Sequence, residues 1–346
     1  MTLERTSQEN RSGREERLGA LLRSFSDRRM VVVGDLVADQ FLFGEISRVS
    51  REAPVLILRH ERTETVPGGA ANCAANLVAM GARATLVGVV GEDEAGCALV
   101  AKLCAAGVDC SRIIQSPVFR TTTKVRILAG QAHSTRQQVI RVDYEDAPLA
   151  DNEVRGKMLA QLREAVAGAD AVIVSDYNYG VADEQTAALL REMTHKNALP
   201  VLVDSRFRLL EFSGFTSATP NEDEVEALLG RKLIDRATLE AAGAELCARL
   251  NYRALLITRG SQGMMLQETD ADPFHIEPIG AREAIDVTGA GDTVIAAYAL
   301  ALASGASFAD AAHLANHAGG LVVMKRGTAT INRPELLASL VHASET

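Results

Sequence analysis

A run of small residues combines a candidate anion site with a candidate acid–base group. It reads Asp286-Val287-Thr288-Gly289-Ala290-Gly291-Asp292-Thr293, and an apolar stretch at 294–302 follows it directly. That stretch predicts a buried helix, so Gly289, Ala290 and Gly291 fall at its N-terminus, where unpaired N–H groups and the helix dipole favour an anion. Asp292 lies in the first turn. This combination suits transfer of a phosphoryl group to a hydroxyl, whose proton the carboxylate accepts. A tight turn that serves packing alone is the alternative.

Two other segments contain candidate ligand-binding residues, one directly after a predicted strand and one directly before a predicted helix. The apolar run at 30–33 ends in Gly34-Asp35, which is typical of a buried strand that leads into a ligand loop. Asp35 is therefore a candidate for holding a hydroxyl group, as is Asp39, although either can simply cap a turn. Gly68 and Gly69 precede a helical run and let the backbone approach a ligand, and Asn72 offers a donor and an acceptor.

Two segments can serve a nucleotide and its metal. Pro220-Asn221-Glu222-Asp223-Glu224 can gather water around Mg²⁺, but an acidic, N-capped helix explains it equally well. The segment from Thr258 to Gly263 follows an apolar run and reads either as a phosphate loop or as the turn of a hairpin. Neither the P-loop pattern nor Gly-x-Gly-x-x-Gly after a strand is present, so any use of ATP takes another route.

Composition and charge argue against several classes of protein. The 346 residues are 47% hydrophobic and 23% charged, as in globular proteins, and no apolar run reaches the roughly 18 residues of a membrane span. A net charge of −9 argues against a nucleic-acid partner. The five cysteines lack metal-site spacing, which indicates reduced thiols. The polar residues 1–17 are no secretory signal and read as a flexible tail, so a cytoplasmic location is the expectation.

The elements that must position these residues alternate along the chain. Strands are expected at 30–35, 84–90, 171–176, 199–204 and 254–258, and helices at 73–80, 92–106, 152–166, 183–196, 223–229, 238–250 and 294–302. This alternation predicts an α/β fold, with a mostly parallel sheet between two layers of helices. Half-polar strands at 46–66 and 119–144 predict a small β lid. We expect one domain over 1–346, whose core covers about 29–45, 67–118 and 145–340.

The motifs at 68–72, 221–224 and 286–293, in that order, resemble the ribokinase-like sugar kinases, also called the phosphofructokinase B family. The resemblance covers 30 to about 332 and implies ATP, Mg²⁺ and a homodimer formed through the lid. It also implies a role for each motif. Asp292 would be the general base, Gly289 to Gly291 the anion hole, and Asp35, Gly68, Gly69 and Asn72 the sugar-binding residues. Asn221 and Glu224 would bind ATP by acting on Mg²⁺ and the phosphates, mainly through water. Ser261, Gly263 and Asn316 would also contact ATP, and backbone oxygens around Asp286 and Thr288 could hold a monovalent cation.

Within this family the chain resembles the kinases of ADP-heptose biosynthesis, at 34–39, 47–55, 138–143, 175–177 and 286–295. That implies phosphorylation of the C1 hydroxyl of D-glycero-β-D-manno-heptose 7-phosphate, for the lipopolysaccharide core. Arg141 is the first candidate for the 7-phosphate, followed by Arg206 and Lys124, because the arginine fork matches phosphate oxygens. Arg206 stands where many relatives have lysine.

Several alternatives stay open at this point. The chain ends at Thr346, which implies a stand-alone kinase without a nucleotidyltransferase domain. The same motifs suit a kinase for another sugar or a nucleoside, such as ribose, fructose or a hexose phosphate. A regulator that binds a sugar or a nucleotide without catalysis is the alternative from another class.

Overall fold

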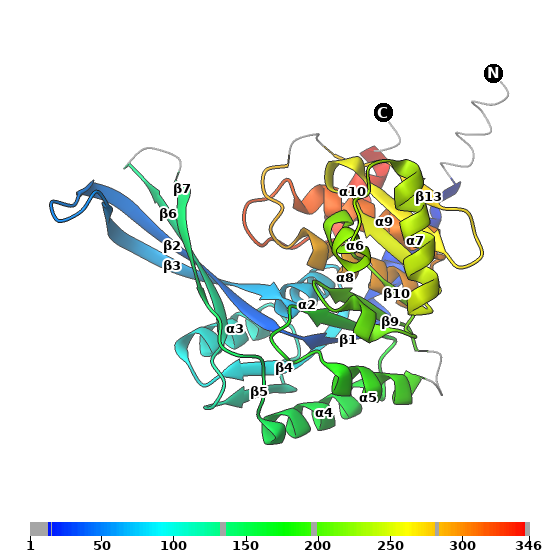
Figure 1. The fold of residues 1–346 in the computed structure, drawn as a ribbon, viewed down its shortest axis with the longest axis horizontal. Helices are drawn as coiled ribbons and strands as arrows, with labels where there is room; N and C mark the ends of the chain where they lie inside the picture. Colours follow the sequence, from blue (N-terminus) through cyan, green and yellow to red (C-terminus); the bar gives the residue numbers. More distant parts are fainter. Residues whose placement is uncertain (1–12, 15, 132–135, 195–198, 281–283, 343–346) are drawn as a thin grey trace.

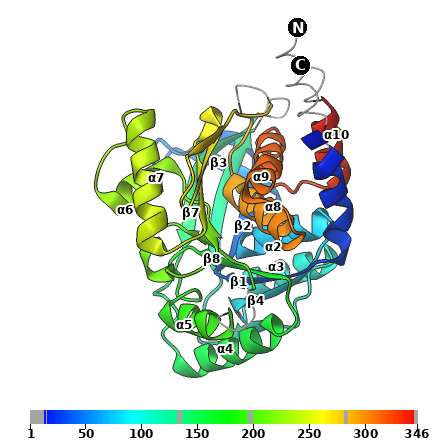
Figure 2. The same ribbon diagram turned by 90° about the vertical axis from the view of Figure 1, so that its right-hand side faces the viewer.

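Two β-sheets organise the chain, a large one inside the body and a small one that projects from it (Figure 1). The computed structural model describes residues 13–14, 16–131, 136–194, 199–280 and 284–342. Figure 2 shows helices on both sides of the large sheet. The predicted α/β fold is therefore confirmed. No helix in the described part of the chain is long and apolar enough to cross a membrane.

The large sheet has nine strands, and all of them except Met264–Glu268 run in the same direction, because that strand pairs antiparallel with both of its neighbours. In spatial order they are β13 (Phe274–Ile276), β12 (Met264–Glu268), β11 (Ala254–Thr258), β10 (Ser217–Ala218), β9 (Val201–Ser205), β8 (Ala171–Asp176), β1 (Arg29–Gly34), β4 (Arg83–Gly91) and β5 (Ile113–Ser116). The strands that follow β1 in sequence, β4 and β5, lie on one side of it, and the later strands β8 to β11 lie on its other side. The order thus reverses between β1 and β8, and such a reversal is where α/β proteins bind ligands.

Alternate residues of the parallel strands point to opposite faces of the sheet and pack in two separate hydrophobic cores. Met30 and Val32 pack with one set of helices, whereas Val31 and Val33 pack with the other set. The first set is α2 (Ala70–Ala79), α3 (Glu94–Ala105), α8 (Ala290–Ala303), α9 (Phe308–Val322) and α10 (Arg333–His342). The second set is α4 (Asn152–Val166), α5 (Glu184–Thr194), α6 (Glu222–Leu229) and α7 (Arg236–Leu250), with a short 3₁₀ turn at Leu209–Phe212.

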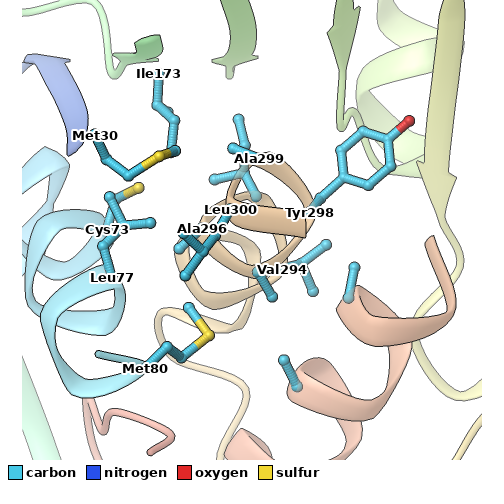
Figure 3. Close-up of a cluster of buried hydrophobic side chains, with 14 of the residues drawn as sticks. Met30, Cys73, Leu77, Met80, Ile173, Val294, Ala296, Tyr298, Ala299 and Leu300 are labelled. Carbon is cyan, nitrogen blue, oxygen red and sulfur yellow. The ribbon is translucent and has the colours of Figure 1, made fainter. Parts of the chain in front are cut away.

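Helix α8 is buried on nearly all sides, as its uninterrupted apolar sequence predicts. Ala296, Ala299 and Leu300 lie among Met30, Cys73 and Ile173 (Figure 3). Small alanines let α2 and the sheet approach α8 closely. The N-terminus of α8 is consequently held in a fixed place relative to β1 and β8.

The small sheet forms the predicted lid. Its strands, in spatial order, are β3 (Leu56–Gly69), β2 (Leu36–Val49), β6 (Thr122–Gly130) and β7 (Gln137–Tyr144). Strands β2 and β3 are antiparallel and shift register twice, whereas β2 and β6 run parallel. The free ends of all four strands extend away from the body (Figure 1).

Two boundaries from the sequence need correction. Residues 36–45 and 67–69 belong to the lid sheet rather than to the core, because the strands continue inward to buried ends at Leu36, Val37 and Gly69. Residues 13–14 and 16–24 are helical, so the tail does not reach residue 17. Leu18 and Leu22 are one helical turn apart and both are buried in the core, which explains the helix. The remainder of the predicted tail, 1–12 and 15, lies outside the described residues.

The contact between β1 and β8 leaves no room for a side chain at Gly34. A Cβ added there would overlap the backbone carbonyl oxygen of Ser175 in the adjacent strand. We expect Gly34→Ala to lower the free energy of unfolding by about 1–3 kcal/mol, as overpacking typically does. The midpoint of urea denaturation measures this change.

Gly156→Ala is the matched control. Gly156 lies in α4, and a Cβ added there meets nothing within 4 Å. Alanine should leave stability unchanged or raise it by about 1 kcal/mol, because it favours the helix. Equal effects of the two substitutions would contradict the close approach of β1 and β8.

Candidate active site

A cavity of about 450 Å³ lies at the carboxyl ends of the central strands, beneath the lid. Among the residues predicted for the site, those that line it are Asp39, Gly69, Lys124, Arg141, Arg206, Asn221, Glu224, Thr288, Gly289, Gly291 and Asp292. Seven elements or loops far apart in the sequence thus meet at one place. Asp35, Gly68, Asn72 and Ala290 lie around it without lining it, whereas Ser261, Gly263 and Asn316 lie elsewhere.

Asp292 is buried in the first turn of α8, and both of its carboxylate oxygens accept a hydrogen bond. The Tyr177 hydroxyl donates to Oδ1 at 2.9 Å, and the Asn72 side-chain amide donates to Oδ2 at 2.8 Å. Burial raises the pKa of Asp292 to about 7, although both hydrogen bonds oppose the increase; the charge of Asp39 adds to it. A carboxylate with this pKa can take a proton near neutral pH.

The backbone next to Asp292 leaves donors free for an anion. Gly289 caps α8 with a left-handed backbone (φ 76°), and the exposed Gly291 follows it. In the described part of the chain, the N–H groups of Gly289, Gly291 and Asp292 meet no acceptor, whereas Ala290 N–H donates to Val287 O at 3.2 Å. The arrangement is that of an anion site at a helix N-terminus, with Ala290 contributing conformation rather than a free donor.

Two residues predicted to hold the sugar have internal partners in the structure. The buried Asp35 carboxylate accepts the backbone N–H groups of Tyr177, Tyr179 and Val181 at 2.8–3.1 Å. It thus shapes the loop after β8, and burial raises its pKa to about 6. Asn72 bonds to Asp292 and, at 3.3 Å, to Gly289 O. Direct contact of either residue with a sugar stays a prediction.

Gly68 and Gly69 are needed for close approach within the protein. A Cβ at Gly68 would lie 2.6 Å from an Asp39 carboxylate oxygen, and one at Gly69 would lie 2.7 Å from the Asp35 carbonyl oxygen. Gly69 also has a positive φ of 57°, which favours glycine. The two glycines let the lid strand β3 turn into α2 directly beside the cavity.

Four cationic side chains line the cavity, and three of them were predicted. Lys124 and Arg141 come from the lid and Arg206 from the loop after β9, while Arg126 of the lid is the additional one. Burial lowers the pKa of Lys124, whose ammonium lies 3.8 Å from Glu145. Arg141 pairs bidentately with Asp143 at 2.6–2.8 Å. Arg126 pairs with the buried Asp39.

Acidic groups face these cations across the cavity. Asn221 and Glu224 form a capping box at the start of α6, at 2.9 Å each way, so this segment is the acidic, N-capped helix that the sequence also allowed. Asp204, at the end of β9, accepts no hydrogen bond from a described residue. Burial and the nearby Glu224 raise its pKa well above the ordinary value. Among the described residues, no group of His, Cys, Asp or Glu is arranged to ligate a metal directly.

Three of the residues predicted to contact ATP lie just after β11 or in α9, outside this cavity. Ser261 is in the 3₁₀ turn Gly260–Gln262, and Gly263 follows it, where a Cβ would overlap the Ile276 carbonyl oxygen. The Asn316 amide donates to Glu277 O at 2.8 Å and borders a separate cavity of about 1070 Å³. Gly263 and Asn316 therefore both lie against the segment after β13, and none of the three residues lines the main cavity.

The charged and hydrogen-bonding residues that sequence reasoning missed at the site include Tyr177, Arg126 and Asp204, and it did not predict the ion pair between Arg126 and Asp39. A usable signal was present for Tyr177 and Asp204, because each stands at the end of a predicted parallel strand. For Arg126 and Asp39 the signal was the alternation within the lid strands, which puts every second residue on one face. Their pairing across strands could not be read without the register.

Comparison with known proteins agrees with this geometry. A model of the pfkB family of carbohydrate kinases matches residues 27–335. The "Bifunctional protein HldE" of Geobacter metallireducens is 40% identical over 315 residues, which cover 91% of this chain and 63% of that protein. The protein of the same name from Caulobacter vibrioides is 40% identical over 327 residues, with 94% and 66% covered. The chain thus spans just under two thirds of the length of these relatives.

Solved structures show the same fold. Ribokinase from Arabidopsis thaliana, in complex with ribose and ATP, superimposes with a TM-score of 0.69 at 22% identity, covering 90% of this chain and 98% of that one. Phosphofructokinase-2 from Escherichia coli gives 0.75 at 19% identity, covering 92% and 99%. The resemblance found in the motifs is confirmed, and an enzyme rather than a regulator is indicated. The chain belongs to the pfkB family of carbohydrate kinases and is a sugar kinase.

Proposed function

We propose that this sugar kinase transfers the γ-phosphoryl group of ATP to the C1 hydroxyl of D-glycero-β-D-manno-heptose 7-phosphate, as a step toward the lipopolysaccharide core. The observation that carries the kinase chemistry is the buried Asp292 carboxylate beside the free N–H groups of α8. The choice of heptose rests on the motif resemblance and on the basic lid. The relatives named HldE share about 40% identity with the chain. Because ATP is a cytoplasmic metabolite, we also propose a cytoplasmic location.

Each residue has a separate task in this proposal. Asp292 accepts the proton of the acceptor hydroxyl, so that the oxygen can attack the γ-phosphorus as the bond to ADP breaks. The N–H groups of Gly289 and Gly291 stabilise the charge on the transferring phosphoryl group, and the dipole of α8 adds to this effect. The lid excludes water, which would otherwise compete as the acceptor.

The acidic side chains on one side of the cavity are suited to Mg²⁺ that is bound to the ATP phosphates and to water molecules held by the protein. Burial raises the pKa of both Glu224 and Asp204, and the Glu224 charge adds to the increase at Asp204; a nearby cation would stabilise both charged forms. One Glu224 oxygen is occupied by the Asn221 N–H, so the other remains for a water ligand. Bound Mg²⁺ supplies charge neutralisation on the phosphates. A monovalent cation near Asp286 and Thr288 remains part of the proposal; Asp286 Oδ2 accepts Gly327 N–H at 2.8 Å.

The register of the lid supports a phosphate site at its cavity face. Asp39 pairs with Lys124 across β2 and β6, and Arg126 pairs with Arg141 across β6 and β7. Like charges directly opposite each other destabilise a sheet. Two opposed arginines over a cavity therefore suit an anion. On β6, Arg126 lies two residues, or about 6.6 Å, beyond Lys124 toward the free end of the lid. A phosphate held by the two arginines can therefore lie at a distance from the reacting hydroxyl.

A second copy of the chain is the partner we propose for the outer lid. Every residue of β7 is exposed, and β7 is an edge strand of its sheet. Val139 and Ile140 are 45% and 53% exposed. Exposed edges with apolar side chains tend to be covered. Sedimentation of the purified protein should give the mass of two chains, and the mass of one chain would contradict this proposal.

Turnover with different acceptors tests the substrate. We expect ADP release with ATP and heptose 7-phosphate, and much slower release with the dephosphorylated heptose, ribose or fructose. Turnover of ribose or fructose, without turnover of heptose 7-phosphate, would overturn the choice of sugar and leave the kinase assignment intact. A kinase for another sugar is the second candidate, because the ribokinase and phosphofructokinase structures share this fold.

Asp292→Asn tests the base. The amide keeps the size of the side chain but cannot accept the proton, so we expect kcat to fall by about 10²–10⁴-fold. Single-turnover kinetics with saturating ATP and sugar measure this. Activity within a few-fold of the wild-type value would remove Asp292 from the role.

Arg141→Ala tests the phosphate contact. We expect KM for the phosphosugar to rise at least about tenfold, because a charge-assisted bidentate contact is lost, while KM for ATP changes little. Arg59→Ala is the matched control, since Arg59 is an exposed lid arginine that pairs with Glu45 at 3.5 Å. If both variants keep the wild-type KM, the phosphate contact belongs to other residues.

A further inference from the structure

The Asp292 carboxylate is held from two sides by donors on different elements. Tyr177 follows β8, and Asn72 lies in the first turn of α2. Their hydrogen bonds to the two carboxylate oxygens are 2.9 and 2.8 Å long. With one donor on each oxygen, the plane of the carboxylate is fixed, and the remaining lone pairs point in set directions.

Both donors are themselves held in place. The Tyr177 backbone N–H donates to Asp35 at 2.8 Å, which fixes the loop after β8. The Asn72 side-chain oxygen accepts from the Asn76 amide at 3.1 Å, and the Asn76 oxygen accepts from Ile331 N–H at 3.2 Å. Groups that are locked by further hydrogen bonds keep a catalytic side chain in its productive geometry.

Tyr177 differs from Asn72 in one respect that makes it informative. Tyr177 lines the cavity and has no second side-chain hydrogen bond among the described residues, whereas Asn72 also bonds to Gly289 O. Loss of Asn72 would therefore disturb the anion site as well. Loss of the Tyr177 hydroxyl alters only the base.

We propose that Tyr177 is a positioning residue of this kinase, whose hydroxyl orients the Asp292 carboxylate toward the acceptor hydroxyl and stabilises its charged form. The inference rests on the proposed role of Asp292 as the base. Tyr177 also connects the base to the lid, since the Lys124 ammonium lies 6.0 Å from the centre of its ring. The base and the sugar-binding lid are thus linked through one side chain.

The charges around Asp292 make the effect of this hydroxyl measurable. The acidic groups that face it are Asp39 of β2, Asp204 of β9, the buried thiol of Cys73 in α2, and Tyr177 itself. These groups do not stabilise the charged form of Asp292, whereas its two hydrogen bonds oppose the rise in its pKa. The Tyr177 pKa is raised well above its ordinary value, chiefly by burial, so the phenol stays protonated and donates throughout the working pH range.

Tyr177→Phe gives the direct test. In the wild type, kcat/KM for the sugar should fall below pH 7, by about tenfold per pH unit, because Asp292 becomes protonated. Without the hydroxyl, the charged form loses a donor, so this acidic limb should move up by about one pH unit or more. We also expect kcat on the alkaline plateau to fall about tenfold, because the carboxylate is no longer oriented.

Tyr179→Phe is the matched control. Tyr179 lies on the same loop, and its backbone N–H also donates to Asp35, but its hydroxyl bonds to Glu145 rather than to the base. The acidic limb of this variant should stay at the wild-type pH. A thermal melt checks that both variants fold. If Tyr177→Phe does not fold, 3-fluorotyrosine at position 177 serves instead; it is a stronger donor and should move the limb to lower pH.

The outcomes separate the two proposals. An acidic limb at the wild-type pH in Tyr177→Phe, together with inactive Asp292→Asn, would overturn the role of Tyr177 and keep Asp292 as the base. An equal shift in Tyr177→Phe and Tyr179→Phe would also overturn it, because a general effect of the loop would explain both. Full activity of Asp292→Asn would overturn the base and the inference together.

Discussion

The site depends on one constraint, the burial of a carboxylate at the N-terminus of a helix that is itself buried. Water cannot solvate the Asp292 charge there, so the protein supplies two hydrogen bonds and the dipole of α8 instead. Burial raises the pKa of Asp292 and the hydrogen bonds lower it, which leaves a value of about 7. The side chain can therefore be charged before the reaction and still accept a proton. Burial therefore creates the basicity that the reaction needs.

This constraint explains why so much of the surrounding structure is internally bonded. Asp35 does not face the cavity but holds the loop that carries Tyr177, and the Asn72–Asn76 pair connects the base to the chain near Ile331. The alanine-rich surface of α8 lets α2 approach closely enough for Asn72 to reach Asp292. A buried polar network of this kind is stable only when its members are satisfied.

The charged side chains that the lid contributes to the cavity are mostly cationic, whereas those of the body are mostly acidic. Its inner face carries Asp39, Lys124, Arg126 and Arg141, arranged by a register that pairs two arginines. The body contributes Asp204 and Glu224 on the opposite side. Cations and acids are thus separated across one cavity, which suits a substrate with an anionic end and a nucleotide whose phosphates bring a metal ion.

The sequence by itself determined the alternation of strands and helices, the lid, the family, and the place of Asp292 at a helix start, because periodicity and local motifs report short-range structure. Tertiary structure alone decided which side chains meet. Asn72 looked like a sugar ligand and bonds to the base, and Asn221 and Glu224 cap α6. The roles of Tyr177 and Arg126 arise from contacts across 115 and 87 residues of chain. No local pattern encodes such distances, because they depend on strand order and register.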